Sequence, residues 1–255
     1  SFSASTLSSS VATMTSSVMQ PTEPSIPAVA CKKIFQDDPN SQDAAYTIFP
    51  GSDKEATVYC DMTGASTGCG GGGWTLVMRI SGHKDTFKYG SNHWTNKLEY
   101  QEYYARNLDD SRETKLSTYY TTPFTQICLG MKYNNVQGWT TLNLTSTSLF
   151  DLISSNAYHA TDLAVSKWKG LIPSGNTVLQ PNCRIQGINA VRGDTGVRIG
   201  IVATKTCGVD DDYNSRLGFG AKGWSCGQDG NNRCGNDARC DGVASIKTTG
   251  YILVK

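Results

Sequence analysis

The chain has 255 residues, of which 38% are hydrophobic and 18% are charged, enough for one sizeable core but not for two full domains. Its 23 Lys and Arg and 22 Asp and Glu give a net charge of +1, and no block of like charge stands out. Nucleic acids and anionic membranes attract clustered positive charge, so this composition argues against both partners. No apolar run approaches the length of a membrane-spanning helix.

The first 30 residues are rich in Ser, Thr and Pro and almost free of charge, which is typical of a linker or stalk. An O-glycosylated stalk and a plain flexible tether fit this composition equally well. The few Val and Met residues in this segment could also pack against a partner chain.

From Cys31 to Lys255 the pattern changes to short apolar runs separated by Gly, Asn and Asp, which predicts one domain of many brief strands. The alternation in Trp74–Ile80 predicts a half-buried strand with Trp74, Leu76, Met78 and Ile80 on one face. Further strands and two helices are predicted, in chain order: a helix within Trp94–Leu108, a strand at Phe124–Met131, a helix within Ser146–Ser154 capped by Ser or Thr, and strands at Val197–Ala203 and Gly250–Lys255. The last of these strands should tie the C-terminal segment into a sheet.

Nine cysteines indicate disulfides, since no two of them form the C-x-x-C pair typical of structural zinc. Cytosolic thiols are kept reduced, so the chain is predicted to be secreted or otherwise extracellular. Because the number is odd, one thiol either stays buried and free or links to another chain. The single glycosylation sequon, Asn143-Leu144-Thr145, is compatible with secretion.

Two neighbouring motifs resemble the opening of a fibrinogen-related domain, which carries a Cys-Asp-Met step followed by a Gly-Gly-Trp-Thr strand: Val58-Tyr59-Cys60-Asp61-Met62 and Gly71-Gly72-Gly73-Trp74-Thr75-Leu76-Val77. Later segments resemble the intelectin-like (X-type lectin-like) branch and secreted or skeletal-matrix proteins of invertebrates: Ser111–Leu116 leading into Pro123-Phe124, Cys128–Lys132, Val197–Ile201, Arg216–Gly220 and the Gly-Tyr-Ile-Leu-Val-Lys end. The resemblance covers roughly Cys31 to Lys255, a sensible length for one domain.

This resemblance implies an α+β fold that is mostly β, a fibrinogen C-terminal-like domain with long irregular disulfide-bonded loops and a lectin-like function. It also implies a bridge between Cys31 and Cys60, which in the chain-entropy description removes about 3–4 kcal/mol of unfolded-state freedom. The chain departs from the family where ligands bind. It lacks the C-terminal Gly-Gly-Trp-Trp and Asn-Leu-Asn-Gly blocks of fibrinogen domains and the histidine of the intelectin calcium site, so neither ligand pocket transfers to it.

Residues 207–241 form the strongest local cluster, with four cysteines among many Asp and Asn residues. Ca²⁺ prefers six to eight oxygen ligands, and a loop held by disulfides can present them. We therefore expect a calcium site drawn from these candidates: Asp210, Asp212, Asn214, Asp229 and Asp237. A solvated, turn-rich loop is the alternative, because turns select the same residues.

The same loop supplies groups that suit a sugar. Tyr213 and Trp224 could stack on its apolar face while the amides of Asn231 and Asn232 bind its hydroxyls. Packing within the core is the alternative for either ring.

Enzyme signatures occur only superficially, and we expect no enzymatic activity. Two G-x-S-x-G matches, at 64–68 and 223–227, lack the strand and helix that a nucleophile elbow needs. The G-x-G-x-x-G match at 68–73 precedes a strand instead of a helix, which indicates a flexible turn. A pair of catalytic carboxylates far apart in the chain stays open.

Two functions follow from these patterns. The first is calcium-assisted binding of glycans or glycoproteins. The second is a structural or adhesive extracellular role, in which the domain, the N-terminal segment and the odd cysteine join copies of the chain.

Arg192-Gly193-Asp194 matches the tripeptide that integrins read, but a turn of that composition is the simpler interpretation.

Overall fold

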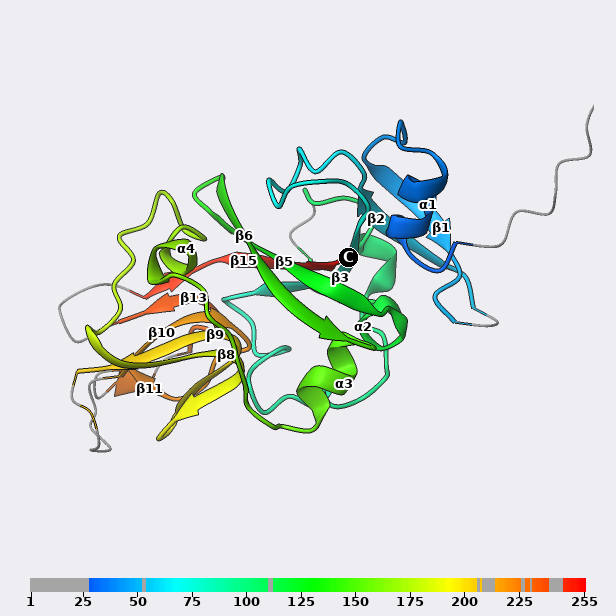
Figure 1. The fold of residues 1–255 in the computed structure, drawn as a ribbon. Helices are drawn as coiled ribbons and strands as arrows, with labels where there is room; N and C mark the ends of the chain where they lie inside the picture. Colours follow the sequence, from blue (N-terminus) through cyan, green and yellow to red (C-terminus); the bar gives the residue numbers. More distant parts are fainter. Residues whose placement is uncertain are drawn as a thin grey trace, which may run out of the picture.

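The computed structural model describes residues 28–51, 54–109, 112–205, 207, 214–225, 228–229, 231–238 and 245–255. Strands dominate this part of the chain, and they form two large antiparallel sheets and a two-stranded hairpin (Figure 1). The prediction of a mostly β protein with disulfides is confirmed.

The seven-stranded sheet has the order β1-β2-β3-β15-β5-β6, with β4 paired to β3. Its strands are β1 (Ala44–Ile48), β2 (Ala56–Asp61), β3 (Trp74–Ser81), β4 (Thr114–Lys115), β5 (Phe124–Tyr133), β6 (Val136–Ser146) and β15 (Thr249–Val254). Four α-helices and two 3₁₀ turns belong to the described chain: α1 (Cys31–Asp37), η1 (Asn92–Trp94), η2 (Glu102–Tyr104), α2 (Thr118–Thr121), α3 (Leu149–Ser154) and α4 (Val165–Lys169).

The six-stranded sheet has the order β14-β13-β10-β9-β8-β7. Its strands are β7 (His159–Ala160), β8 (Asn182–Arg192), β9 (Thr195–Thr204), β10 (Asn214–Phe219), β13 (Cys234–Asp237) and β14 (Ile246–Lys247), and the hairpin is made of β11 (Trp224–Ser225) and β12 (Gln228–Asp229). Figure 1 shows this sheet on the left and the seven-stranded sheet at the centre and right.

The four predicted strands are present, and the segment before Lys255 is a central strand, because β15 lies between β3 and β5. For β3, however, the prediction of a half-buried strand is wrong, since Trp74 to Ile80 are all buried. The start of α1 covers the second face, where the backbone N–H of Cys31 donates to Thr75 Oγ1 at 3.0 Å. Further along that face, the Arg79 guanidinium donates to the Tyr104 carbonyl at 3.2 Å.

The predicted helix within Trp94–Leu108 is wrong, since only the short turns η1 and η2 form there. The backbone of Tyr100 is committed to a bridge, with its N–H and C=O bonded to Lys115 at 2.8 Å each. Gln101 then takes a φ of 47°, a left-handed conformation that a helix cannot contain. The helix expected within Ser146–Ser154 is confirmed as α3, capped by the Ser148 hydroxyl, which accepts from the Asp151 N–H at 3.0 Å.

The two sheets meet at Thr248, the one residue between β14 and β15. Its N–H donates to the Cys234 carbonyl at 2.9 Å, and its carbonyl accepts from the Gly82 N–H at 2.8 Å. Gly250 leaves no space for a side chain, because an added Cβ would lie 2.5 Å from the Cys234 sulfur. The chain therefore passes directly from one sheet to the centre of the other.

One hydrophobic core draws side chains from both sheets. Met78 and Ile252 of the seven-stranded sheet pack in the same cluster as Ile199 and Phe219 of the six-stranded sheet, and all four are fully buried. Burial of this shared surface couples the stability of the two sheets.

Three disulfides join described cysteines. They are Cys31–Cys60, the pair that the resemblance implies, Cys69–Cys128 and Cys183–Cys207, with Cα–Cα distances of 5.6, 5.9 and 5.4 Å.

Cys234 is free and fully buried, so this thiol is enclosed and does not reach another chain. Burial raises its pKa to about 12, which keeps it protonated at neutral pH. Cys226 and Cys240 lie outside the described residues.

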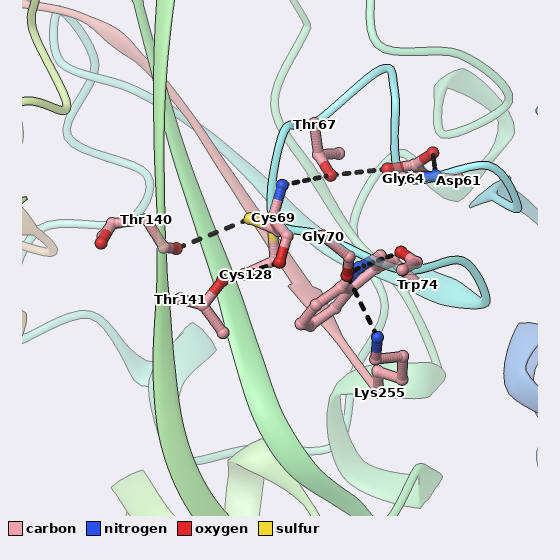
Figure 2. The surroundings of a disulfide bond; sticks show 11 residues. Asp61, Gly64, Thr67, Cys69, Gly70, Trp74, Cys128, Thr140, Thr141 and Lys255 are labelled. Atoms are coloured by element: carbon pink, nitrogen blue, oxygen red, sulfur yellow. Dashed lines mark hydrogen bonds between the residues drawn. A yellow bond between two sulfur atoms is a disulfide. The ribbon is translucent and has the colours of Figure 1, made fainter.

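The segment Gly68–Gly73 is a turn, as predicted, but it is firmly held and not flexible. Figure 2 shows Cys69 joined to Cys128 of β5, with Trp74 beside Gly70. The Trp74 indole N–H donates to the carbonyls of Gly70 at 3.2 Å and Gly71 at 3.0 Å. A Cβ at Gly72 would lie 1.6 Å from the Met62 carbonyl oxygen, so only glycine fits there.

Lys115 of β4, which pairs with Met78 of β3, is a fully buried cation. Its ammonium group donates to the Asn96 carbonyl at 2.7 Å and to Asn96 Oδ1 at 2.9 Å. Burial lowers its pKa to about 8, because an ammonium ion loses hydration in the protein interior.

We predict that Lys115 makes stability increase with pH between about 8 and 10.5. In that interval the unfolded chain keeps a proton on Lys115 that the folded chain has released, so raising the pH favours folding. Below about pH 8 Lys115 is protonated in both states, and its contribution to the free energy of unfolding does not change with pH. Urea unfolding of the wild type and of Lys115→Met at pH 8 and pH 10 measures this, and the wild type should gain stability relative to the variant at pH 10. Parallel pH profiles would contradict the prediction.

Candidate functional site

The ends of four strands lie at one end of the six-stranded sheet, where the Asp-rich segment 205–213 and segment 238–245, which contains Asp241, both attach. Thr204 pairs with Asn214, Arg216 pairs with Asp237, and Asn236 pairs with Ile246. Because these strands are antiparallel, segments 205–213 and 238–245 both attach at this end. Three residues of the predicted site, Asp210, Asp212 and Tyr213, belong to the first segment and lie outside the described residues.

A disulfide fastens the same end of the sheet. Cys183, near the start of β8, is bonded to Cys207, which follows β9 by three residues. The Asn182 side chain adds a hydrogen bond to the Lys205 carbonyl at 2.5 Å. These two links tie the start of β8 to Lys205 and Cys207, which follow β9.

Two predicted metal ligands, Asn214 and Asp237, lie on adjacent strands of this sheet. Asn214 is half-buried at the first position of β10. Asp237 is 1% exposed, and its Oδ2 forms an ion pair with Arg216 Nη2 at 3.0 Å, where Arg216 is equally buried. The structure therefore gives Asp237 a structural partner, which the sequence did not predict.

The other candidates follow β10 in the chain. Trp224 of β11 pairs with Asp229 of β12, and the structure describes their backbones alone. Asn231 is exposed, whereas Asn232 is 2% exposed and its amide N–H groups donate to the carbonyls of Asn236 at 3.0 Å and Ile246 at 2.8 Å. Within the described chain the Asn232 amide oxygen has no hydrogen-bond partner, so it can accept from a ligand or bind a cation.

In the parts of the chain that the structure describes, no three His, Cys, Asp or Glu side chains come together as a metal-binding group. A calcium site at this end of the sheet therefore depends on Asp210 and Asp212 together with the described residues around them. Amide and backbone oxygens are suitable further ligands for Ca²⁺.

Asp43 and Asp61 form a pair of neighbouring carboxylates beside the Gly-rich turn. Burial raises the pKa of Asp61; burial also acts on Asp43, but hydrogen bonds, led by that from Ser66, outweigh it and lower its pKa. Asp61 accepts from the Gly64 N–H at 2.8 Å and from the Thr67 hydroxyl at 2.5 Å (Figure 2). These donors belong to the loop itself, so the pair fixes the loop that carries Cys69.

An apolar groove of about 640 Å³ runs between α1, the start of β5 and the end of β6. Val29, Phe124 and Val254 line it, and Val29 is 53% exposed. Sequence reasoning missed this groove because its walls come from residues more than 200 positions apart.

The glycosylation sequon lies at the rim of this groove. Asn143 is exposed on β6, the edge strand of its sheet, and its Oδ1 accepts from Gln126 Nε2 at 2.9 Å. Thr145, which completes the sequon, lines the groove. This position leaves Asn143 accessible to glycosylation, which stays a prediction.

Arg192-Gly193-Asp194 forms the tight turn between β8 and β9, where Arg192 pairs with Thr195 and Gly193 has a φ of 53°. The turn that the sequence predicted is confirmed, and Gly193 and Asp194 are exposed.

A comparison with models of known protein families finds no match, and a comparison with curated proteins finds no significant relative. None of the helices in the described ranges is long and apolar enough to cross a membrane.

We predict that Asp237 stabilises the fold through Arg216. Replacing Asp237 by Asn removes one charge of a buried, directly bonded ion pair, which should lower the free energy of unfolding by about 3–5 kcal/mol. The matched control is Asp37→Asn, which removes the exposed Lys33–Asp37 pair and should cost less than about 1 kcal/mol. Chemical denaturation measures the free energy of unfolding of both variants. If Asp237→Asn left the stability unchanged but abolished Ca²⁺ binding, Asp237 would instead be a metal ligand.

Proposed function

We propose that this chain is a secreted, fibrinogen-related and intelectin-like recognition domain that binds carbohydrate with the help of Ca²⁺. The site is the end of the six-stranded sheet at which segments 205–213 and 238–245 attach. The observation that carries the proposal is the strand register together with the Cys183–Cys207 bond, which attaches the Asp-rich segment 205–213 beside segment 238–245, with Asp241, at one fastened end of the sheet.

The candidate residues at this end have defined roles in the proposal. Asp210, Asp212 and Asn214 would hold the cation, since carboxylate and amide oxygens are the ligands that Ca²⁺ prefers. Asp229 belongs to the loop between Phe219 and Cys234, which leaves β10 at the opposite end from Asn214, so it is not part of this ligand set. Bound Ca²⁺ supplies a positive charge that coordinates sugar hydroxyls.

Aromatic and amide groups would complete the sugar site. Tyr213 and Trp224 offer flat faces for the apolar side of a sugar ring, and Asn231 and Asn232 offer hydrogen bonds to its hydroxyls. The unpaired amide oxygen of Asn232 within the described chain supports its role as an acceptor.

The proposal predicts that Asp210→Asn/Asp212→Asn weakens Ca²⁺ binding at least tenfold, because two carboxylates are lost from the ligand set. Calorimetric titration with CaCl₂ measures the affinity, and a glycan array run with and without EDTA measures sugar retention. The control is Asp109→Asn/Asp162→Asn, which removes the same charge from two exposed positions and should leave both readouts unchanged. Sugar retention that is equal in EDTA, or equal Ca²⁺ affinity in both double variants, would contradict the proposal.

The apolar groove favours a second candidate function, a structural or adhesive role through protein–protein contacts. Exposed apolar surface of this kind is characteristic of interaction sites, and residues 1–27 join the described chain next to it. The same glycan array distinguishes the two functions, because a domain used only for assembly retains no sugar in either Ca²⁺ or EDTA.

A further inference from the structure

A second pocket, of about 440 Å³, lies where the two sheets meet. Its walls come from the turn between β5 and β6, the junction of β14 and β15, and the loop after β3. We call it the basic pocket, because His83, Lys132 and Lys247 line it together with the hydroxyl groups of Ser245 and Thr249, and its described lining has no acidic side chain.

The two lysines of the basic pocket are half-buried and lie close together. Lys132 pairs with Thr249 across β5 and β15, and Lys247 precedes Thr249 by two residues. Among the described residues neither ammonium group has an ion-pair or hydrogen-bond partner, in contrast to Lys33, which pairs with Asp37. Two partly desolvated cations that share one hollow create a local positive potential despite the net charge of +1.

A carboxylate near Lys247 is already paired with another cation. Lys247 contributes to lowering the pKa of Asp85, but Asp85 Oδ1 is bound to Arg233 Nε at 2.7 Å. An anionic group in the pocket would receive charge-assisted hydrogen bonds from the two ammonium groups and further bonds from the hydroxyls.

The position of the pocket connects it with the proposed sugar site. Ser245, part of its wall, ends segment 238–245, which attaches at the end of the six-stranded sheet described above. A polysaccharide bound at that end could therefore place a substituent in the basic pocket.

We propose that the basic pocket binds the sulfate or carboxylate group of an acidic polysaccharide. This inference rests on the proposed function and names its substrate class, an acidic in place of a neutral glycan. The pocket itself contains no residue of the calcium site, so its own contribution to binding persists in EDTA, while the contribution of the calcium site is lost.

Binding of dextran sulfate, carboxymethyl dextran and neutral dextran to the full chain tests this proposal, measured by biolayer interferometry in EDTA and at two salt concentrations. We expect both charged polymers to bind, more weakly at high salt, and neutral dextran not to bind. Polyglutamate of matched charge is the probe for a polyanion without sugar, and in Ca²⁺, where the proposed sugar site also contributes, it should bind at least tenfold more weakly than carboxymethyl dextran.

The variant Lys132→Gln/Lys247→Gln should lose about tenfold in affinity for the charged dextrans. The matched control Lys32→Gln/Lys97→Gln removes the same charge from exposed lysines outside the pocket and should change affinity less than twofold. Lys132→Arg/Lys247→Arg keeps the charge and should retain binding, which separates loss of the pocket from loss of the fold.

Equal losses in the two Gln double variants, equal binding of polyglutamate, or no binding of charged dextran would each overturn the inference. Failure of the proposed calcium site has a different signature: charged dextrans still bind through Lys132 and Lys247, while Asp210→Asn/Asp212→Asn leaves Ca²⁺ affinity unchanged.

Discussion

The close approach of Gly250 to the Cys234 thiol links the two sheets of the described structure, because a Cβ added at Gly250 would lie 2.5 Å from the sulfur. Thr248, between these residues in the fold, bonds to Cys234 on one side and to Gly82 on the other. A chain that changes sheets within one residue must bring two backbones very close, and this requires a glycine at 250 and a small apolar side chain at 234. The free cysteine is therefore a packing residue at the centre of the molecule, and its burial explains why it has no disulfide partner.

The junction also determines where binding surfaces can form. The basic pocket lies directly at it, because Thr248 and Thr249 belong to the pocket wall. The Asp-rich segment 205–213 and segment 238–245 attach at one end of the six-stranded sheet, and β13 and β14 lead from that end to the junction. On the far side, β15 continues to Lys255, whose carbonyl accepts from the backbone N–H groups of Thr125 and Gln126 at 2.9 and 3.1 Å beside the apolar groove. The basic pocket thus lies at the start of β15 and the apolar groove at its end, while β13 and β14 connect the junction to the end of the six-stranded sheet.

The sequence predicts the strands well, because alternation and apolar runs report directly on pleated, buried backbone. It fails where tertiary contacts override local preference: Tyr100 pairs with Lys115, so the helix expected around it does not form, and α1 covers the face of β3 expected to be open. For the candidate site, composition identifies the Asp-rich segments but not the buried Arg216–Asp237 pair. The basic pocket has no signal in the sequence, since His83, Lys132 and Lys247 come from three distant segments.

The claim that the two sheets form one cooperative unit through this junction is tested most directly by native-state hydrogen exchange of Gly250→Ala. The control is Gly90→Ala, where an added Cβ meets open space. Overpacking at Gly250 should cost about 1–3 kcal/mol, and amides in β3 and β5 and in β9 and β10 should lose protection together, with the control close to wild type. Loss of protection in one sheet alone, or equal stability of the two variants, would contradict the account.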